Sequence, residues 1–189
     1  MLIHKRIFDL FLTIILLVVL AIPMLATFIA VRVSSEGKAL YWSQRIGKNN
    51  KTFLMPKFRS MKIDTPATAS HLINDIDLYL TPIGSFIRKY SLDEFPQLFS
   101  ILKGDMSFVG PRPALFNQDD LINLRIKKGV DNLTPGLTGW AQINGRDELS
   151  IEEKVKFDEE YITLSSLRFD IKILIITLFK VIKREGISH

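Results

Sequence analysis

The 189-residue sequence contains no cysteine and only three histidines. Without cysteine there can be no disulfide, no thiolate nucleophile and no zinc–thiolate or iron–sulfur site. The histidines, His4, His71 and His189, are far apart in the sequence, which argues against histidine-based acid–base or metal chemistry. The sequence also lacks a P-loop, a GxGxxG run and an HExxH metal motif. Thiolate chemistry is therefore excluded, and carboxylates are among the groups that remain for covalent or acid–base chemistry.

Charge is missing from one long stretch, residues 10–31, which contains none of the 25 basic and 20 acidic residues. As a straight helix this stretch would be about 33 Å long, against a hydrocarbon core of roughly 30 Å. It is too long for the apolar region of a signal peptide, and it is followed by a poor cleavage site. We therefore expect a membrane-associated segment over residues 1–34.

Pro23 interrupts this segment. Proline removes a backbone hydrogen bond, and its ring clashes with the preceding turn. The segment can then be a kinked helix that spans the bilayer or a re-entrant helix that turns back, and the residues alone leave both open. Both ends are expected on the cytoplasmic side, because basic residues flank the segment at Lys5, Arg6, Arg32 and Lys38.

The remainder, residues 35–189, is expected to form a cytoplasmic catalytic domain. Its first part can face anionic membrane lipids, because residues 32–62 hold eight basic residues and one acidic residue. A small β-hairpin is predicted by two β-rich stretches joined by Gly-Lys-Asn-Asn-Lys, at residues 39–46 and 52–58. Other patterns predict helices over residues 92–102, 117–128 and 150–165, and structured loops over residues 104–113 and 134–145.

A second apolar helix is expected at about residues 167–184. Its uncharged run, residues 173–179, is far too short to span a bilayer. An interfacial helix and a helix in the soluble core fit this segment equally well, and the neighbouring membrane segment favours the interfacial one. The predicted fold is α+β: a proline-broken re-entrant membrane helix, a small β-hairpin and amphipathic interfacial helices packed on a compact cytoplasmic domain.

Asp93 and Glu94 form a pair of adjacent carboxylates at the expected start of a helix. One interpretation is structural, with Ser91 as the N-cap and Glu94 completing a capping box. The other is functional: one carboxylate serves as nucleophile or base, and both can bind a hard cation such as Mg²⁺.

Several basic residues are suited to phosphate oxygens. Lys57 and Arg59 lie at the end of the predicted hairpin, and Arg112 lies between two prolines that restrict its backbone. Arg146 follows a glycine-rich segment that allows close approach of the backbone. Together with the carboxylate pair, these residues indicate phosphate-ester chemistry at a membrane.

Four motifs carry a specific resemblance. They are Lys-Phe-Arg-Ser-Met at 57–61, Leu-Asp-Glu-Phe-Pro-Gln at 92–97, Gly-Asp-Met-Ser-Phe-Val-Gly-Pro-Arg-Pro at 104–113 and Pro-Gly-Leu-Thr-Gly-Trp-Ala-Gln at 135–142. In this order they resemble the signatures of bacterial sugar transferases. More narrowly, the chain is similar to the small monotopic phosphoglycosyl transferases that initiate glycoconjugate assembly on undecaprenyl phosphate, as in bacterial N-glycosylation pathways. The match covers nearly the whole chain.

The resemblance implies transfer of sugar 1-phosphate from a UDP-sugar to undecaprenyl phosphate, with release of UMP and a requirement for Mg²⁺. It implies that Asp93 attacks the sugar-bearing phosphate and that Glu94 is its catalytic partner. The phosphates and the uridine are then assigned to Lys57, Arg59, Arg112 and Arg146. The metal is assigned to Asp93, Glu94 and Asp158, and Asp170 is expected to be a structural or site residue.

The resemblance also implies a location in one leaflet of the bacterial inner membrane, on its cytoplasmic face, with downstream glycosyltransferases as possible partners. An N-acetylated sugar is expected from the minimal form of the chain, with glucose and galactose open. A membrane-bound Mg²⁺-dependent phosphatase or pyrophosphatase is an alternative, as is a non-catalytic membrane scaffold. Nucleic-acid binding is a poor fit, because the basic excess adjoins the membrane segment.

Overall fold

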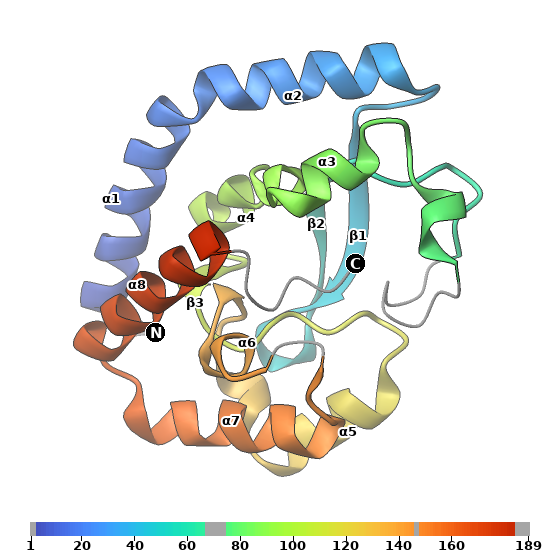
Figure 1. Cartoon of the computed structure of the whole chain (residues 1–189). Helices are drawn as coiled ribbons and strands as arrows, with labels where there is room; N and C mark the ends of the chain where they lie inside the picture. Colours follow the sequence, from blue (N-terminus) through green and yellow to red (C-terminus); the bar gives the residue numbers. More distant parts are fainter. Residues whose placement is uncertain (1–2, 67–74, 146–147, 184–189) are drawn as a thin grey trace.

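The computed structural model describes residues 3–66, 75–145 and 148–183. In Figure 1 two long helices, α1 and α2, form a bent arm along one side and across the top of the molecule, and α5 and α7 lie at the opposite end. The helices are α1 (Ile3–Val19), α2 (Ala21–Ser34), α3 (Gly84–Lys89), α4 (Gln97–Lys103), α5 (Asp119–Lys127), α6 (Trp140–Ile143), α7 (Ile151–Leu164) and α8 (Leu167–Lys183). The strands are β1 (Leu40–Ile46), β2 (Thr52–Phe58), β3 (Ser107–Val109) and β4 (Gly136–Thr138), and short 3-10 turns are η1 (Lys48–Asn50), η3 (Ile76–Tyr79), η4 (Leu92–Glu94) and η5 (Val130–Asn132). This mixture of helices and small sheets confirms the α+β class.

The predicted hairpin is confirmed. β1 and β2 pair antiparallel, in a register that runs from Leu40 opposite Phe58 to Ile46 opposite Thr52. Asn49 and Asn50 in the turn have φ of 54° and 58°, a left-handed conformation that asparagine tolerates better than most residues. The hairpin places β2 in contact with α4 and with the 3-10 turn η4, and in Figure 1 its upper part lies behind α3.

The two segments expected to be loops contain a parallel pair of strands, β3 and β4. Each strand has only three residues, too few to give a sequence signature among the surrounding glycines and prolines. The backbones approach closely at Gly136, where a Cβ atom would meet the backbone nitrogen of Gly110 at 2.1 Å. Glycine is therefore required for this contact.

The predicted helices near the C-terminal half are confirmed as α5, α7 and α8, but the helix expected over residues 92–102 is divided. A 3-10 turn, η4, comes first, and α4 begins only after Pro96. Proline has no backbone N–H to continue an α-helix from the preceding turn, so it is accepted at the start of α4 but not within it.

The arm is broken at Leu20, between α1 and α2, and the two helices are bent by 62°. Pro23 lies in the first turn of α2, and its ring would clash with the carbonyl of Val19, four residues earlier. This clash explains why the break lies at this place. No single helix of the described residues is long and apolar enough to cross a membrane, and only the bent pair meets that test, by length and composition.

Polar side chains attach the N-terminal end of α1 to the rest of the molecule. The Nζ of Lys5 donates to the carboxylate of Asp170, to the hydroxyl of Tyr161 and, at 2.9 Å, to the carbonyl of Val109. Asp170 is 2% exposed, so this ion pair is buried. This buried contact fits the structural one of the two roles expected for Asp170, a structural or a site residue.

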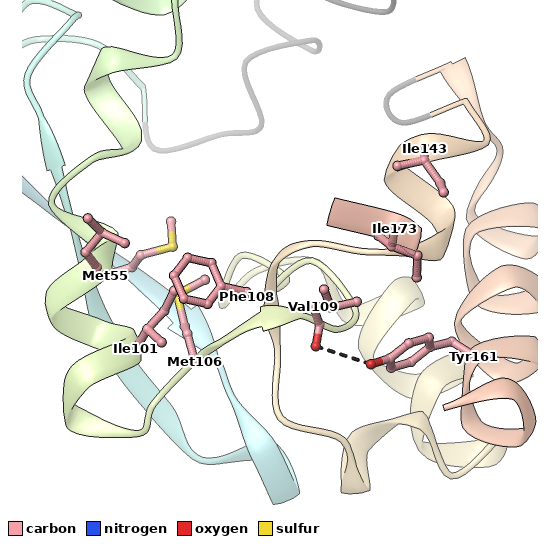
Figure 2. Packing of buried hydrophobic residues seen from close by; sticks show 9 residues of the cluster. Met55, Ile101, Met106, Phe108, Val109, Ile143, Tyr161 and Ile173 are labelled. Carbon is pink, nitrogen blue, oxygen red and sulfur yellow. Dashed lines mark hydrogen bonds between the residues drawn. The ribbon is translucent and has the colours of Figure 1, made fainter. Parts of the chain in front are cut away.

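α8 contributes one face to the core and leaves another exposed. Ile173 is fully buried in the main cluster, which Figure 2 shows together with the hydrogen bond from the Tyr161 hydroxyl to the Val109 carbonyl (3.4 Å). The opposite face exposes Ile175, Leu178 and Phe179, each more than half exposed. One face of α8 is therefore part of the core, and a membrane contact of the exposed face stays a prediction.

Candidate active site

Asp93 and Glu94 lie in η4, between α3 and α4. Asp93 is only 8% exposed. The Oε1 atom of Glu94 accepts hydrogen bonds from Lys57 Nζ on β2 and from Arg112 Nη2, both at 2.9 Å. The structure therefore brings together four of the residues predicted from the sequence, although they come from three separate motifs.

The capping-box interpretation of this pair is wrong. Ser91 has a φ of 54° and its side chain makes no cap hydrogen bond, while the Glu94 carboxylate is directed to Lys57 and Arg112. A true capping box is present elsewhere, between Ser150 and Glu153 at the start of α7. The carboxylate pair at Asp93 therefore does not serve to start a helix.

Burial raises the pKa of Asp93 above its ordinary value, and the neighbouring charge of Glu94 raises it further. Lys57, Arg88 and Arg112 act in the opposite direction and favour the ionised carboxylate. Burial likewise lowers the pKa of Lys57, against the attraction of both carboxylates. The site is thus a buried charge cluster in which each ionised group depends on its neighbours.

Sequence reasoning missed two arginines of this cluster. Arg88, on α3, is close enough to Asp93 to favour its ionised form. Arg45, on β1, has its pKa lowered to about 10 by burial and by Arg112, while Glu94 opposes the shift. Neither lies within one of the four motifs, so no local signal identifies them, and only the packing of α3 and the hairpin brings them here.

Arg59 is not part of this cluster. It is 8% exposed, and its Nη2 donates to the Ser35 hydroxyl at 3.0 Å and to the Ser35 carbonyl at 3.3 Å. Its guanidinium also lies against Gly37, where a Cβ atom would meet Arg59 Nη1 at 2.3 Å. In the structure Arg59 fixes the connection between α2 and β1, and its assignment to substrate phosphate stays a prediction.

Asp158 does not join the carboxylate pair in a metal site. Its Oδ2 accepts from Arg125 Nε at 3.0 Å and from Arg125 Nη2 at 2.7 Å, and the side chain is buried. Across the described ranges, no group of three or more histidine, aspartate or glutamate residues could hold a metal ion. The structure therefore does not group Asp158 with Asp93 and Glu94 as predicted, and the binding of a metal ion by that pair stays a prediction. Arg146 lies outside the described residues.

Apolar residues beside the carboxylates pack against the arm. Leu92 and Phe95, which flank the pair in sequence, pack on a buried cluster that includes Val31 of α2 and Phe58 of β2. The charge cluster consequently lies next to the base of the apolar arm.

Comparison with known proteins decides the family. A family model described as bacterial sugar transferase matches residues 1–184. The chain belongs to the bacterial sugar transferase family. This finding confirms the resemblance carried by the four motifs and the expectation that the protein is an enzyme of the transferase class.

Relatives of this bacterial sugar transferase differ in length. "Uncharacterized sugar transferase EpsL" of Bacillus subtilis is 41% identical over 98% of this chain and 90% of its own length. "Undecaprenyl-phosphate glucose phosphotransferase" of Komagataeibacter xylinus is 40% identical over 98% of this chain. "UDP-glucose:undecaprenyl-phosphate glucose-1-phosphate transferase" of Escherichia coli is 37% identical over 93% of this chain. The match spans only 36% and 39% of the last two proteins.

The contacts of Arg59 predict that its replacement acts on stability. Arg59→Met should lower the free energy of unfolding by about 1–3 kcal/mol, because the partly buried carbonyl and hydroxyl of Ser35 lose a charged donor. Thermal denaturation in detergent measures this. Arg32→Met is the matched control, since Arg32 also bonds this connection, at Gly37, but from an exposed position; it should shift stability by less than about 0.5 kcal/mol. Unchanged stability of Arg59→Met would contradict the anchoring role.

Proposed function

We propose that this sugar transferase moves sugar 1-phosphate from a UDP-sugar to undecaprenyl phosphate and releases UMP. The observation that carries the proposal is the buried Asp93 beside Glu94, with Glu94 held between Lys57 and Arg112 at 2.9 Å each. The names of two of these relatives support it, since they describe transfer of glucose or glucose 1-phosphate with undecaprenyl phosphate as the acceptor. The product would be the lipid-linked sugar that begins glycoconjugate or polysaccharide synthesis.

The reaction proceeds in two displacements. A carboxylate oxygen of Asp93 attacks the phosphorus of the sugar-bearing phosphate, and the bond from this phosphorus to the oxygen of the uridine-bearing phosphate breaks. UMP leaves with that bonding electron pair, and a phosphosugar–Asp93 anhydride remains. A phosphate oxygen of undecaprenyl phosphate then attacks the same phosphorus and displaces the Asp93 carboxylate. No water and no redox partner are needed.

Cationic side chains are what this chemistry requires most, because both the carboxylate and the substrate phosphates are negative. Lys57, Arg88 and Arg112 are preorganised around Asp93 and Glu94, in a buried site where charge interactions are stronger than in water. They would keep Asp93 ionised and stabilise the charge that develops on the phosphate oxygens. Arg146 is kept as a proposed phosphate or uridine ligand on the resemblance alone.

Two adjacent carboxylates fit a Mg²⁺ ion, which usually binds through one or two carboxylates and completes its coordination with water and substrate phosphates. Asp93 and Glu94 would hold it. When bound, the ion supplies further neutralisation of the diphosphate. Asp158 is left out of this proposal, because its carboxylate is buried against Arg125 and no described group of three carboxylates joins it to Asp93 and Glu94.

We infer that residues 1–34 form a re-entrant arm in one leaflet and that residues 35–189 form a catalytic domain on the cytoplasmic face of the bacterial inner membrane. The 62° bend and the exposed apolar side chains of both arm helices support this topology. The outer face of α8 adds a second apolar surface. Anionic lipids would contact the basic residues beside the arm.

A panel of UDP-sugars tests the reaction. With Mg²⁺ and undecaprenyl phosphate, the full chain should release UMP and form a lipid-linked sugar, and Asp93→Asn should lower the rate at least 10³-fold, an order-of-magnitude expectation for losing a nucleophile. Asp120→Asn, an exposed carboxylate on α5, is the control and should keep full activity. The N-acetylated donor stays a prediction, to be ranked in the panel against UDP-glucose and UDP-galactose.

Other products would decide against the proposal. Free sugar phosphate or inorganic phosphate, with no lipid-linked sugar, would indicate a phosphatase or pyrophosphatase. Undiminished activity of Asp93→Asn would remove the nucleophile assignment. A complete absence of turnover would favour a scaffold.

Topology has its own test, which is simple because the chain contains no cysteine. Ile3→Cys and Lys38→Cys place single thiols at exposed positions on either end of the arm. The re-entrant arrangement predicts that a membrane-impermeant maleimide labels neither thiol in intact spheroplasts and labels both in inverted membrane vesicles. Labelling of Ile3→Cys from the periplasmic side would show a spanning helix instead.

A further inference from the structure

The backbone around Arg112 is fixed by hydrogen bonds from other parts of the chain. Pro111 and Pro113, on either side of it, have restricted φ angles and no N–H groups. The carbonyl of Pro111 accepts from Gly136 N at 2.9 Å, and the carbonyl of Pro113 accepts from Arg45 Nη1 at 3.1 Å. The carbonyl of Arg112 itself accepts from Arg125 Nη1 at 2.8 Å.

Arg125 is in turn oriented by Asp158. Two of its nitrogens, Nε and Nη2, donate to the same carboxylate oxygen of Asp158, which leaves Nη1 directed at the Arg112 carbonyl. Both side chains are largely buried, at 12% and 2% exposed. A guanidinium held by three hydrogen bonds at one end of a rigid loop has little freedom to move.

This arrangement is better explained by positioning than by stability. A buried ion pair gives little net stability compared with apolar residues of the same size, because both charges lose their hydration. Burial raises the pKa of Asp158, which reflects the same desolvation, and Arg125 opposes the shift. The pair nevertheless connects α5 and α7 to the loop whose Arg112 side chain reaches Glu94.

We propose that Asp158 and Arg125 are positioning residues that hold Arg112 against Glu94 and the substrate phosphates. The inference depends on the proposed function, and it replaces the metal-ligand role predicted for Asp158. Reaction geometry is sensitive to displacement, since a shift of about 1 Å in a catalytic group can lower the rate by roughly 100-fold. The pair acts on the reaction only through Arg112.

The test is a double-mutant cycle on the full chain with UDP-sugar, Mg²⁺ and undecaprenyl phosphate. Asp158→Asn should lower kcat by about 10- to 100-fold and leave the Mg²⁺ concentration for half-maximal activity unchanged. In an Arg112→Lys background the same substitution should change kcat by less than about 2-fold, because the residue it positions is already altered. Glu159→Gln, the next residue on α7 and about half exposed, is the control and should match the wild type.

Two outcomes would overturn the proposal. A rise in the Mg²⁺ requirement of Asp158→Asn by tenfold or more would return Asp158 to the metal site. An equal loss of kcat in the wild-type and Arg112→Lys backgrounds would show that Asp158 acts independently of Arg112.

A second variant covers the case in which Asp158→Asn does not fold. Arg125→Met combined with Asp158→Leu replaces the pair by apolar groups of similar size, which proteins often tolerate. It should keep the wild-type melting temperature and still lose kcat, and full activity would contradict positioning. Hydrogen–deuterium exchange gives a readout that needs no turnover: peptides covering residues 107–116 should exchange faster in this variant. If the wild type released no UMP, the proposed function would fail, and this exchange would still test the contact.

Discussion

The structure depends on one electrostatic constraint: two adjacent carboxylates are held in a largely buried position and therefore need cations beside them. An isolated buried carboxylate would take up a proton, and a protonated Asp93 could not attack phosphorus. Glu94 intensifies the problem, because its own charge opposes ionisation of Asp93. The 2.9 Å bonds from Lys57 and Arg112 to Glu94 compensate for this charge. The same cations can then meet the phosphates of a substrate.

The fold follows from the need to bring these groups together. The hairpin supplies Lys57, α3 supplies Arg88, and the loop after β3 supplies Arg112, so each cation comes from a different part of the chain. The arm is joined to the same core by the buried ion pair of Lys5 and Asp170 and by Val31, which packs beneath the carboxylates. An apolar surface and a phosphate-handling site are therefore parts of one packed unit, as a lipid-phosphate acceptor would require.

Much of the fold could be predicted from the sequence, because many of its elements are determined by their own residues. The hairpin, with its two asparagines in the turn, and the helices of the C-terminal half are local structures that their own residues specify. The parallel pair of β3 and β4 could not be predicted, since it joins three-residue strands that are distant in sequence. The sequence predicts a break of the arm at Pro23. The structure places the bend at Leu20, three residues earlier, because the ring of Pro23 would clash with the carbonyl of Val19.

The site shows a different limit. Arg59 and Asp158 carry groups that suit phosphate and metal, but the same groups suit backbone carbonyls and buried ion pairs equally well. Residue type alone does not distinguish these uses, and only the direction of the side chain does. Arg45 and Arg88 were overlooked for the converse reason, because neither lies within one of the four motifs and only the fold brings them to the carboxylates. Position within the fold, rather than residue chemistry, separates the side chains around Asp93 and Glu94 from those that bond elsewhere.

The central claim is that Asp93 becomes covalently linked to the phosphosugar. The most direct measurement is mass spectrometry of the full chain incubated with UDP-sugar and Mg²⁺ in the absence of undecaprenyl phosphate. The account predicts an adduct of one sugar phosphate on the peptide that contains Asp93, released as lipid-linked sugar when undecaprenyl phosphate is added. An adduct on another residue would contradict it. So would formation of the lipid-linked sugar by an enzyme on which rapid quenching never detects a sugar-phosphate adduct.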